Sequence, residues 1–260
     1  MEAIINLQGK AALVCGASQG IGAATARALA DAGCRVTGLA RSAEKLERVM
    51  GGLAGSGHDS LVQDLADRAG LAQAVAVRLG RAPYHILVNN TAGPKPGPIS
   101  QAEEAAFLEG FQNHVLVSAL LARLLIPGMK AEGYGRIVNI ISTSVKVPIP
   151  NLGVSNTIRG AMANWAKTLS LELGPFGITV NNVLPGFTRT PRLDALIRTA
   201  AEKTGETEEA VAAQWQQTIP ARRFADPAEV GAAVAFLASP DAGYINGINL
   251  PVDGGRTGCL

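Results

Sequence analysis

The sequence predicts a doubly wound α/β fold, with a seven-stranded parallel sheet that carries helices on both faces. Short β-rich runs alternate with segments of helical composition along the 260 residues, and a glycine-rich loop joins the first run to the first helical segment. Apolar residues make up 47% of the chain, which is enough for a buried core. Such alternation is typical of a parallel sheet covered on both faces. Because no linker-like change in composition interrupts it, we predict a single domain over residues 1–260.

The elements follow from the spacing of apolar residues, glycines and prolines. Strands are expected at Lys10–Cys15, Arg35–Ala40, Asp59–Asp64, His85–Asn89, Arg136–Ile141, Ile178–Leu184 and Tyr244–Leu250. Helices are expected at Ile21–Ala32, Ala43–Leu53, Arg68–Leu79, Ala102–Ala131 and Val154–Leu173. Residues 191–238 read as helical and irregular, and we expect 191–225 to form a small helical lid over the carboxyl edge of the sheet, where such folds bind ligands.

Composition and charge exclude several classes of protein. Lys and Arg number 23 and Asp and Glu 21, so the net charge is +2, and without a basic block we expect no nucleic-acid partner. Cys15, Cys34 and Cys259 lack the spacing of a disulfide framework or a zinc site, so no metal is predicted. The chain does not begin like a signal peptide and has no run of 18 apolar residues, so we expect a cytoplasmic protein without a membrane span.

The glycine-rich loop, Cys15-Gly16-Ala17-Ser18-Gln19-Gly20-Ile21-Gly22, lies between the first expected strand and the first expected helix. Gly16 lets the chain turn, and Gly20 and Gly22 let the backbone approach a pyrophosphate and the helix pack closely. The N-terminus of the helix then offers free N–H groups and a positive dipole to phosphates. The spacing is G-x3-G-x-G, and a plain tight turn is the alternative. Its place between strand and helix favours a dinucleotide-binding, Rossmann-type loop.

The choice of cofactor depends on the end of the second strand. NAD would call for an acidic residue there to bind the ribose hydroxyls, but the chain has Ala40, Arg41 and Ser42. Arg41 can bind a 2′-phosphate bidentately and Ser18 could add a hydroxyl, so NADP is predicted and NAD is less expected. Asp64, which ends the third strand, would suit the adenine amino group. The alternatives are that Arg41 is a solvated charge and Asp64 a helix N-cap.

With these motifs in place, the chain resembles the short-chain dehydrogenase/reductase family over nearly its whole length. The resembling segments are CGASQGIG at 15–22, Asp64, VNNTA at 88–92 (where the family has NNAG), GRIVNIIS at 135–142, ITVNNVLPGFTRT at 178–190 and YINGINLPVDGG at 244–255. The resemblance implies a reductase of the 3-oxoacyl type, joined as a tetramer or dimer through two long helices. It implies cofactor contacts from the loop residues Gly16, Ser18, Gln19, Gly20, Ile21 and Gly22, and from Arg41, Ser42, Asp64, Leu65, Asn90, Arg159, Pro185, Gly186, Thr188 and Thr190.

The catalytic positions depart from the family pattern. The serine after the fifth strand is present as Ser142, but the Tyr-x-x-x-Lys pair falls on Ser155 and Arg159. The family's helix asparagine falls on His114, and neighbouring Asn113 recovers it only with a shift of one residue. Three of the four catalytic positions are therefore changed.

These changes remove the usual proton donor. Ketone reduction needs a hydride on carbon and a proton on oxygen, from a group within hydrogen-bond reach whose pKa is near the working pH. Ser155 is a far weaker acid than a phenol, and Arg159 could hold the nicotinamide ribose but does not deprotonate. His114, with an ordinary pKa of about 6.5, could deliver a proton through a water while Ser142 polarises the substrate oxygen. The alternatives are a His114 that only packs in its helix, and an inactive site that kept the fold.

Basic residues gather in the loops at the carboxyl edge of the expected sheet. Lys95, Lys146 and Arg192 are candidates to bind an anionic substrate, and Arg189 lies in the same set of loops. The alternative is that each is a solvated loop charge.

Three functions remain open from the sequence. The first is an NADP(H)-dependent oxidoreductase acting on a small carbonyl or alcohol with non-standard proton delivery. The second is a lyase, dehydratase or isomerase, in which Ser142, His114 and Arg159 would stabilise an enolate. The third is a non-catalytic nucleotide-binding subunit. A homotetramer or homodimer is also expected, because the helices at 102–131 and 154–173 are longer and more apolar than a covered helix needs.

Overall fold

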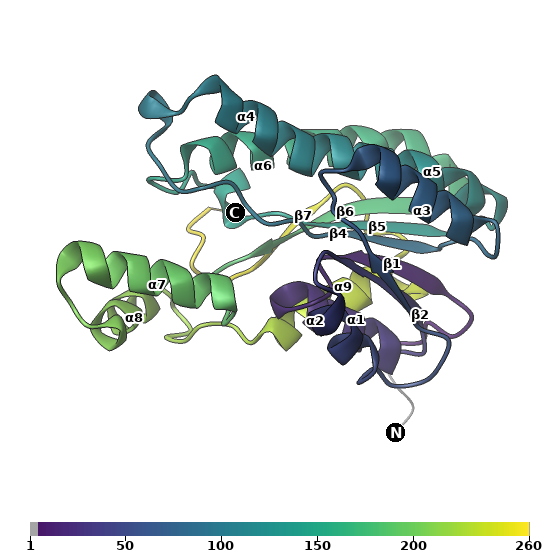
Figure 1. Cartoon of the computed structure of the whole chain (residues 1–260), viewed down its shortest axis with the longest axis horizontal. Coiled ribbons are helices and arrows are strands. Elements are labelled where there is room, and N and C mark those ends of the chain that lie inside the picture. The colour runs from purple at the N-terminus through teal and green to yellow at the C-terminus, as the bar shows by residue number, and fades with distance from the viewer. Residues whose placement is uncertain (1–4, 260) are drawn as a thin grey trace.

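Seven parallel strands form one sheet in the computed structural model, which describes residues 5–259 (Figure 1). The strand order is β3-β2-β1-β4-β5-β6-β7. The strands are β1 (Ala11–Cys15), β2 (Arg35–Ala40), β3 (Asp59–Val62), β4 (Ile86–Asn89), β5 (Gly135–Ile140), β6 (Ile178–Pro185) and β7 (Asn249–Val252). The order reverses direction between β1 and β4, the switch point at which doubly wound sheets bind ligands. The predicted Rossmann-type fold class is confirmed.

Helices cover both faces of the sheet (Figure 1). One face carries α1 (Gly20–Asp31), α2 (Ala43–Met50) and α9 (Pro227–Ala238), and the other carries α3 (Arg68–Leu79), α4 (Glu104–Phe111), α5 (Val117–Ala131) and α6 (Gly153–Leu173). Successive strand residues serve opposite faces. Leu13 belongs to the core that includes Leu121 of α5, whereas Val14 belongs to the core that includes Leu29 of α1.

The long helix predicted over 102–131 is interrupted. A π-helical turn, Gln112–Leu116, separates α4 from α5. Such turns occur frequently at functional sites, and this one contains His114. The whole stretch Glu104–Ala131 is long and apolar enough to cross a membrane by length and composition alone, but 44% of its most apolar part is buried inside the protein, and a buried core helix can have the same length and composition.

The seventh strand begins later than predicted, at Asn249 instead of Tyr244. Gly247 has a φ of +71°, which breaks an extended run, and the Tyr244 side chain is fully exposed. The second helix is also shorter than predicted, because it ends at Met50 before the Gly51-Gly52 pair.

A ladder of asparagine side chains crosses four neighbouring strands. Asn89 donates from Nδ2 to Asn139 Oδ1 at 2.8 Å, Asn139 donates to Asn182 at 2.9 Å, and Asn182 donates to Asn249 at 2.8 Å. These residues are register partners in β4, β5, β6 and β7. The first three side chains are buried, so the ladder gives partners to amide groups that water cannot reach, although Asn89 Oδ1 at its end has no partner among the described residues.

Helices α7 (Pro191–Thr204) and α8 (Glu208–Gln217) stand apart from the sheet (Figure 1). They share a small apolar core in which the rings of Phe187 and Trp215 stack with their centroids 5.0 Å apart. The two ends of this segment are joined by a bridge between Thr188 and Ala225. Arg189 N donates to Ala225 O and Ala225 N donates to Phe187 O, both at 2.9 Å.

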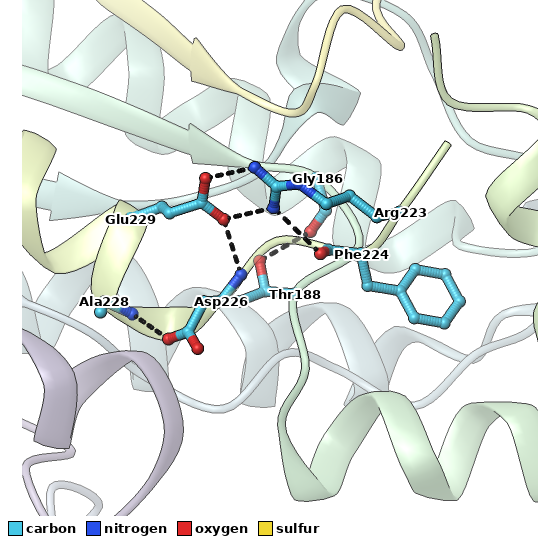
Figure 2. A network of polar contacts seen from close by, with 7 residues as sticks. All are labelled: Gly186, Thr188, Arg223, Phe224, Asp226, Ala228 and Glu229. Carbon is cyan, nitrogen blue, oxygen red and sulfur yellow. Dashed lines mark hydrogen bonds and ion pairs between the residues drawn. The ribbon is translucent and has the colours of Figure 1, made fainter. Parts of the chain in front are cut away.

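Polar contacts fix the base of this segment where it meets α9 (Figure 2). Arg223 donates from Nη1 and Nη2 to the two carboxylate oxygens of Glu229, both at 2.6 Å. Asp226 N donates to Glu229 at 2.8 Å, and the Asp226 side chain accepts from Ala228 N, which completes a capping box at the start of α9. The hydrogen bonds to Glu229 lower the pKa of its carboxyl group from 4.5 to about 2.

Candidate active site

The glycine loop folds tightly against the residues after β4 and β6. Gly16 has a φ of +64°, and a Cβ built on it would stand 2.7 Å from Nδ2 of Asn90. Asn90 donates from Nδ2 to Cys15 O at 3.2 Å, which ties the end of β4 to the loop. A Cβ on Gly20 would stand 3.1 Å from Cγ2 of Thr190. Both positions therefore require glycine for these close approaches.

The start of α1 can accept a phosphate. Its N-cap, Gln19, makes no side-chain capping bond, and no acidic residue occupies the first turn. The first N–H groups of the helix have no intrahelical partner, so they remain available to an anion. This uncapped terminus and the glycine cradle fit the diphosphate of a dinucleotide.

Arg41 directly follows β2, and Asp64 lies two residues beyond β3, which ends at Val62 and not at Asp64 as predicted. Arg41 Nη1 is 3.8 Å from Asp64 Oδ2, and the Arg41 side chain is 76% exposed, so its guanidinium is accessible to a 2′-phosphate. Asp64 is not the N-cap of α3, because Asp67 accepts the capping bond from Gly70 N. Ser42 starts α2 without a side-chain capping bond.

The end of β6 leads into α7 through the other predicted cofactor residues. Thr190 is the N-cap of α7 and accepts from Leu193 N at 3.3 Å. Its hydroxyl also donates to Thr188 O at 3.2 Å, while Thr188 donates to Gly186 O at 3.2 Å. These short-range bonds hold the Thr190 methyl against Gly20, so the start of α7 meets the glycine loop.

Ser142 and Ser155 occupy the expected places at the end of β5 and in the first turn of α6. Ser142 Oγ accepts from Ser144 N at 3.1 Å, which caps a short 3-10 turn over Thr143–Val145. Ser155 is 8% exposed, and its hydroxyl has no hydrogen-bond partner within residues 5–259. It is therefore free to bind a ligand or a water.

Arg159 is buried beside the end of β5. Its Nη1 donates to Ile140 O at 3.2 Å, and the residue is only 7% exposed. Its Nε is buried and has no hydrogen-bond partner among the residues that the structure describes. Burial, together with the positive charge of Arg192, lowers the pKa of the Arg159 guanidinium to about 10. Arg159 therefore remains charged at neutral pH.

His114 is buried in the π-helical turn, where it is hydrogen bonded through Nδ1 to the hydroxyl of Thr91. Burial and the positive charge of Arg159 lower the pKa of His114 to about 3, with a smaller effect from Arg192. The imidazole is therefore neutral near pH 7. A neutral imidazole is a weak acid, so direct proton donation from His114 is unfavourable.

The basic loop residues do not all gather at this site. Arg192 joins Arg159, because both guanidinium groups lie against Gly93. Lys95 is exposed in the loop after β4 and Lys146 is half-buried after the 3-10 turn. Arg189 instead lines a cavity of about 410 Å³ with Arg27 and the residues that begin α9.

Sequence reasoning missed several features of this region. The hydroxyl of Thr91 faces His114, Gly93 makes room for both arginines, and Arg192 Nη2 donates to Pro94 O at 3.4 Å. The altered NNAG motif was the available signal for Thr91. No sequence pattern indicates the contacts of Gly93 and Pro94, which depend on how α7 returns to the loop after β4.

A glycine cradle and an uncapped helix N-terminus at the switch point, next to polar side chains that follow β4, β5 and β6, are typical of a dinucleotide-dependent enzyme. Comparison with known proteins gives the family. Residues 16–257 match the family described as Enoyl-(Acyl carrier protein) reductase. The chain belongs to the short-chain dehydrogenase/reductase family and is an oxidoreductase of that family.

Individual relatives align over nearly the full chain. The 3-oxoacyl-[acyl-carrier-protein] reductase FabG of Vibrio cholerae is 33% identical, over 96% of this chain and 98% of its own. The NADPH-dependent reductase BacG of Bacillus subtilis is 30% identical, over 95% of this chain and 97% of its own.

Solved structures also resemble this fold over nearly the full chain. L-sorbose reductase from Gluconobacter frateurii, solved with NADPH and L-sorbose, superposes with a TM-score of 0.91. The alignment covers 99% of this chain and 100% of that one at 28% identity. Together with the NADPH-dependent relative, this complex supports the prediction of NADP as cofactor.

Proposed function

We propose that the protein interconverts a small carbonyl compound, of the 3-oxoacyl type or similar, and its alcohol with NADP(H), without a tyrosine as proton donor. The observation that supports this most is the cofactor cradle. Gly16 and Gly20 pack against Asn90 and Thr190 below an uncapped α1 N-terminus, and Arg41 is exposed at the end of β2. A protein that no longer binds a dinucleotide would not be expected to keep glycine at these close approaches.

When bound, NADPH would supply the hydride. Arg41 would bind the 2′-phosphate, the start of α1 the diphosphate, and Thr190 the carboxamide. At the reacting end, Ser142 would donate a hydrogen bond to the substrate oxygen, and the charge of Arg159 would stabilise the negative charge that develops on it. Arg159 keeps its proton in this scheme, because its pKa stays near 10.

The proton would reach the substrate oxygen from water. A serine at position 155 is smaller than the tyrosine of the family pattern, which leaves room for a water beside its unpartnered hydroxyl. Ser155 and the neutral His114 would orient that water, and neither needs to ionise. The proton would therefore come from bulk solvent through a positioned water, which is slower than transfer from a phenol.

The remaining expectations are part of the same proposal. Residues 191–225, with α7 and α8, would act as a substrate lid on a single domain. The protein would work in the cytoplasm as a homotetramer or homodimer, joined through the long helices over 104–131 and 153–173, without a nucleic-acid or membrane partner and without a metal.

One observation favours a second function. Ser142, Ser155 and the neutral His114 offer no good proton donor near neutral pH, whereas Arg159 supplies a buried positive charge. Such a site suits stabilisation of an enolate, as in an isomerase, dehydratase or other lyase with no net change in the nicotinamide.

The test begins with calorimetric titration of nucleotide-free protein with NADPH and with NADH. We expect NADPH to bind much more tightly. Small ketones, 3-oxoacyl thioesters and oxo acids are then screened for consumption of NADPH, with the alcohol identified by mass spectrometry. NADPH binding without carbonyl reduction, accompanied by deuterium exchange next to the carbonyl, would favour the isomerase or lyase function. Binding without either reaction would leave a non-catalytic nucleotide-binding subunit.

A further inference from the structure

Two guanidinium groups from different helices meet at one glycine. A Cβ built on Gly93 would stand 3.3 Å from Nη2 of Arg159 and 3.2 Å from Nη2 of Arg192. Arg159 comes from α6 and Arg192 from the first turn of α7, so two elements far apart in sequence bring two like charges together. Gly93 lies in the loop after β4, and its missing side chain is what leaves space for both tips.

No carboxylate of the described residues balances these charges. None of the ion pairs formed within residues 5–259 includes Arg159 or Arg192. Among residues 5–259, their hydrogen-bond partners are backbone carbonyls, Ile140 O for Arg159 and Pro94 O for Arg192. The third titratable group in the cluster, His114, is neutral and adds no negative charge. A buried guanidinium without a counter-ion is costly, so the arrangement calls for an anion from outside the chain.

We propose that Arg159 and Arg192 form an anion-binding site for a carboxylate carried by the substrate, which makes the substrate a small oxo acid or hydroxy acid. This inference rests on the proposed function, because it assigns the anion to the compound whose carbonyl is reduced. Two guanidinium groups that lie against the same glycine can both donate to one planar carboxylate, with its two acceptor oxygens. Arg192 is exposed and lies at the start of α7, so it can close on a ligand, whereas Arg159 is fixed by burial.

Binding of the anion would remove two unfavourable effects at once. The positive charge of Arg192 and the loss of water both act against the charged form of Arg159. A carboxylate between the two groups would supply the missing negative charge and accept the hydrogen bonds that the protein leaves unmade. The ligand would then stabilise the folded protein by an amount that rises with the logarithm of its concentration above Kd.

The direct test is calorimetric titration with malonate, a small dicarboxylate, and separately with inorganic phosphate. We expect saturable malonate binding to the unmodified protein. In Arg192→Gln, we expect the affinity to fall by about tenfold or more, since a charge-assisted hydrogen bond is lost. The matched control is Arg198→Gln, which removes an exposed arginine of the same helix that pairs with Glu208. Equal affinity in Arg192→Gln, or no saturable malonate binding, would overturn the proposal. Binding of phosphate but not malonate would overturn its carboxylate form.

A second pair of variants leaves the charges in place. In Gly93→Ala, the added methyl group displaces both guanidinium tips by a few tenths of an ångström, so malonate should bind several-fold more weakly. Gly97→Ala is the control, because a Cβ at Gly97 of the same loop meets nothing within 4 Å. Neither glycine has a positive φ, so both variants are expected to fold. Equal malonate affinity in the two variants would count against the site.

The same titrations with saturating NADPH separate this proposal from the proposed function. If malonate binds equally well with NADPH present, the anion site is distinct from the cofactor's phosphates, as proposed. Competition between them would instead assign the arginines to a phosphate of the cofactor and overturn the inference. A protein that binds malonate through Arg192 but fails to bind NADPH would keep the anion site and lose the oxidoreductase function.

Discussion

Thr91 and His114 are hydrogen bonded to each other. Thr91 follows β4, and His114 lies 23 residues further along the chain in the π-helical turn. The threonine hydroxyl gives the buried imidazole a partner, and Arg159 contributes to keeping that imidazole neutral. The loop after β4, the π-helical turn and α6 therefore form one connected arrangement.

The neutral state of His114 makes stability depend on pH. The folded-state pKa of about 3 lies below the ordinary value of 6.5, so between these values the unfolded chain binds more protons. Stability attributable to His114 is complete above 6.5 and is lost as the pH falls toward 3, by about 1.4 kcal/mol per pH unit inside that window. We expect His114→Asn to show a shallower loss than the unmodified protein, measured by urea unfolding at several pH values. Parallel pH curves for the two proteins would contradict this.

Arg41 should determine which nucleotide binds. In Arg41→Ala we expect the affinity for NADPH to fall by about tenfold to a hundredfold, because a charge-assisted contact with the 2′-phosphate is lost. The affinity for NADH should change little. Calorimetry with both nucleotides measures the difference, and Arg48→Ala, an exposed arginine on α2 paired with Glu44, is the control. An equal loss for both nucleotides would show that Arg41 does not read the phosphate.

The asparagine ladder predicts a large effect from one substitution. Asn139→Ala leaves Asn89 Nδ2 and Asn182 Oδ1 buried without partners. Each orphaned group costs about 1–3 kcal/mol, so the free energy of unfolding should fall by about 2–6 kcal/mol. Asn164→Ala, on the exposed side of α6, should change it by less than about 0.5 kcal/mol. Chemical denaturation compares the two, and similar values would mean that the ladder contributes little.

The ion pair between Arg223 and Glu229 should be visible in a titration of the carboxyl group. The lowered pKa means that the stabilisation from this pair is complete above about pH 4.5 and is lost as the pH falls toward 2. We expect NMR of the Glu229 carboxyl carbon to give a midpoint near 2, and Arg223→Gln to move it up toward 4.5. Arg222→Gln, at the neighbouring residue, should leave it in place. An unchanged midpoint in Arg223→Gln would assign the low pKa to the Asp226 N–H instead.

Much of the fold was predictable because apolar runs and glycines mark the elements of a parallel sheet strongly. The helix predicted at Arg68–Leu79 and the strand at Arg35–Ala40 agree with the structure residue for residue. The seventh strand was placed too early, because Tyr244 and Ile245 have strong β-propensity while the turn at Gly247 is fixed by tertiary contacts.

Site residues could be predicted from the sequence only where all of them lie in one segment. The glycine loop and Ser142 could be placed from local sequence, since each depends on a single strand end. The neutrality of His114 and the meeting of Arg159 with Arg192 could not, because they depend on burial and on contacts between α6, α7 and the loop after β4. The alignment of Asn89, Asn139, Asn182 and Asn249 likewise follows from strand register, which no short motif encodes.

The bridge between Thr188 and Ala225 gives the α7–α8 segment the properties of a replaceable insert. Its entry and exit lie next to each other, so the segment leaves the sheet and returns at one point. A change in its length or sequence beyond Thr190 would leave the strands and the cofactor cradle undisturbed, as long as the two ends still pair and Thr190 keeps its contact with Gly20. Evolution could thus exchange this part to suit new substrates, and a chimaera that keeps Thr190 and grafts the rest of a relative's segment up to Ala225 would inherit the donor's substrate range on an unaltered scaffold.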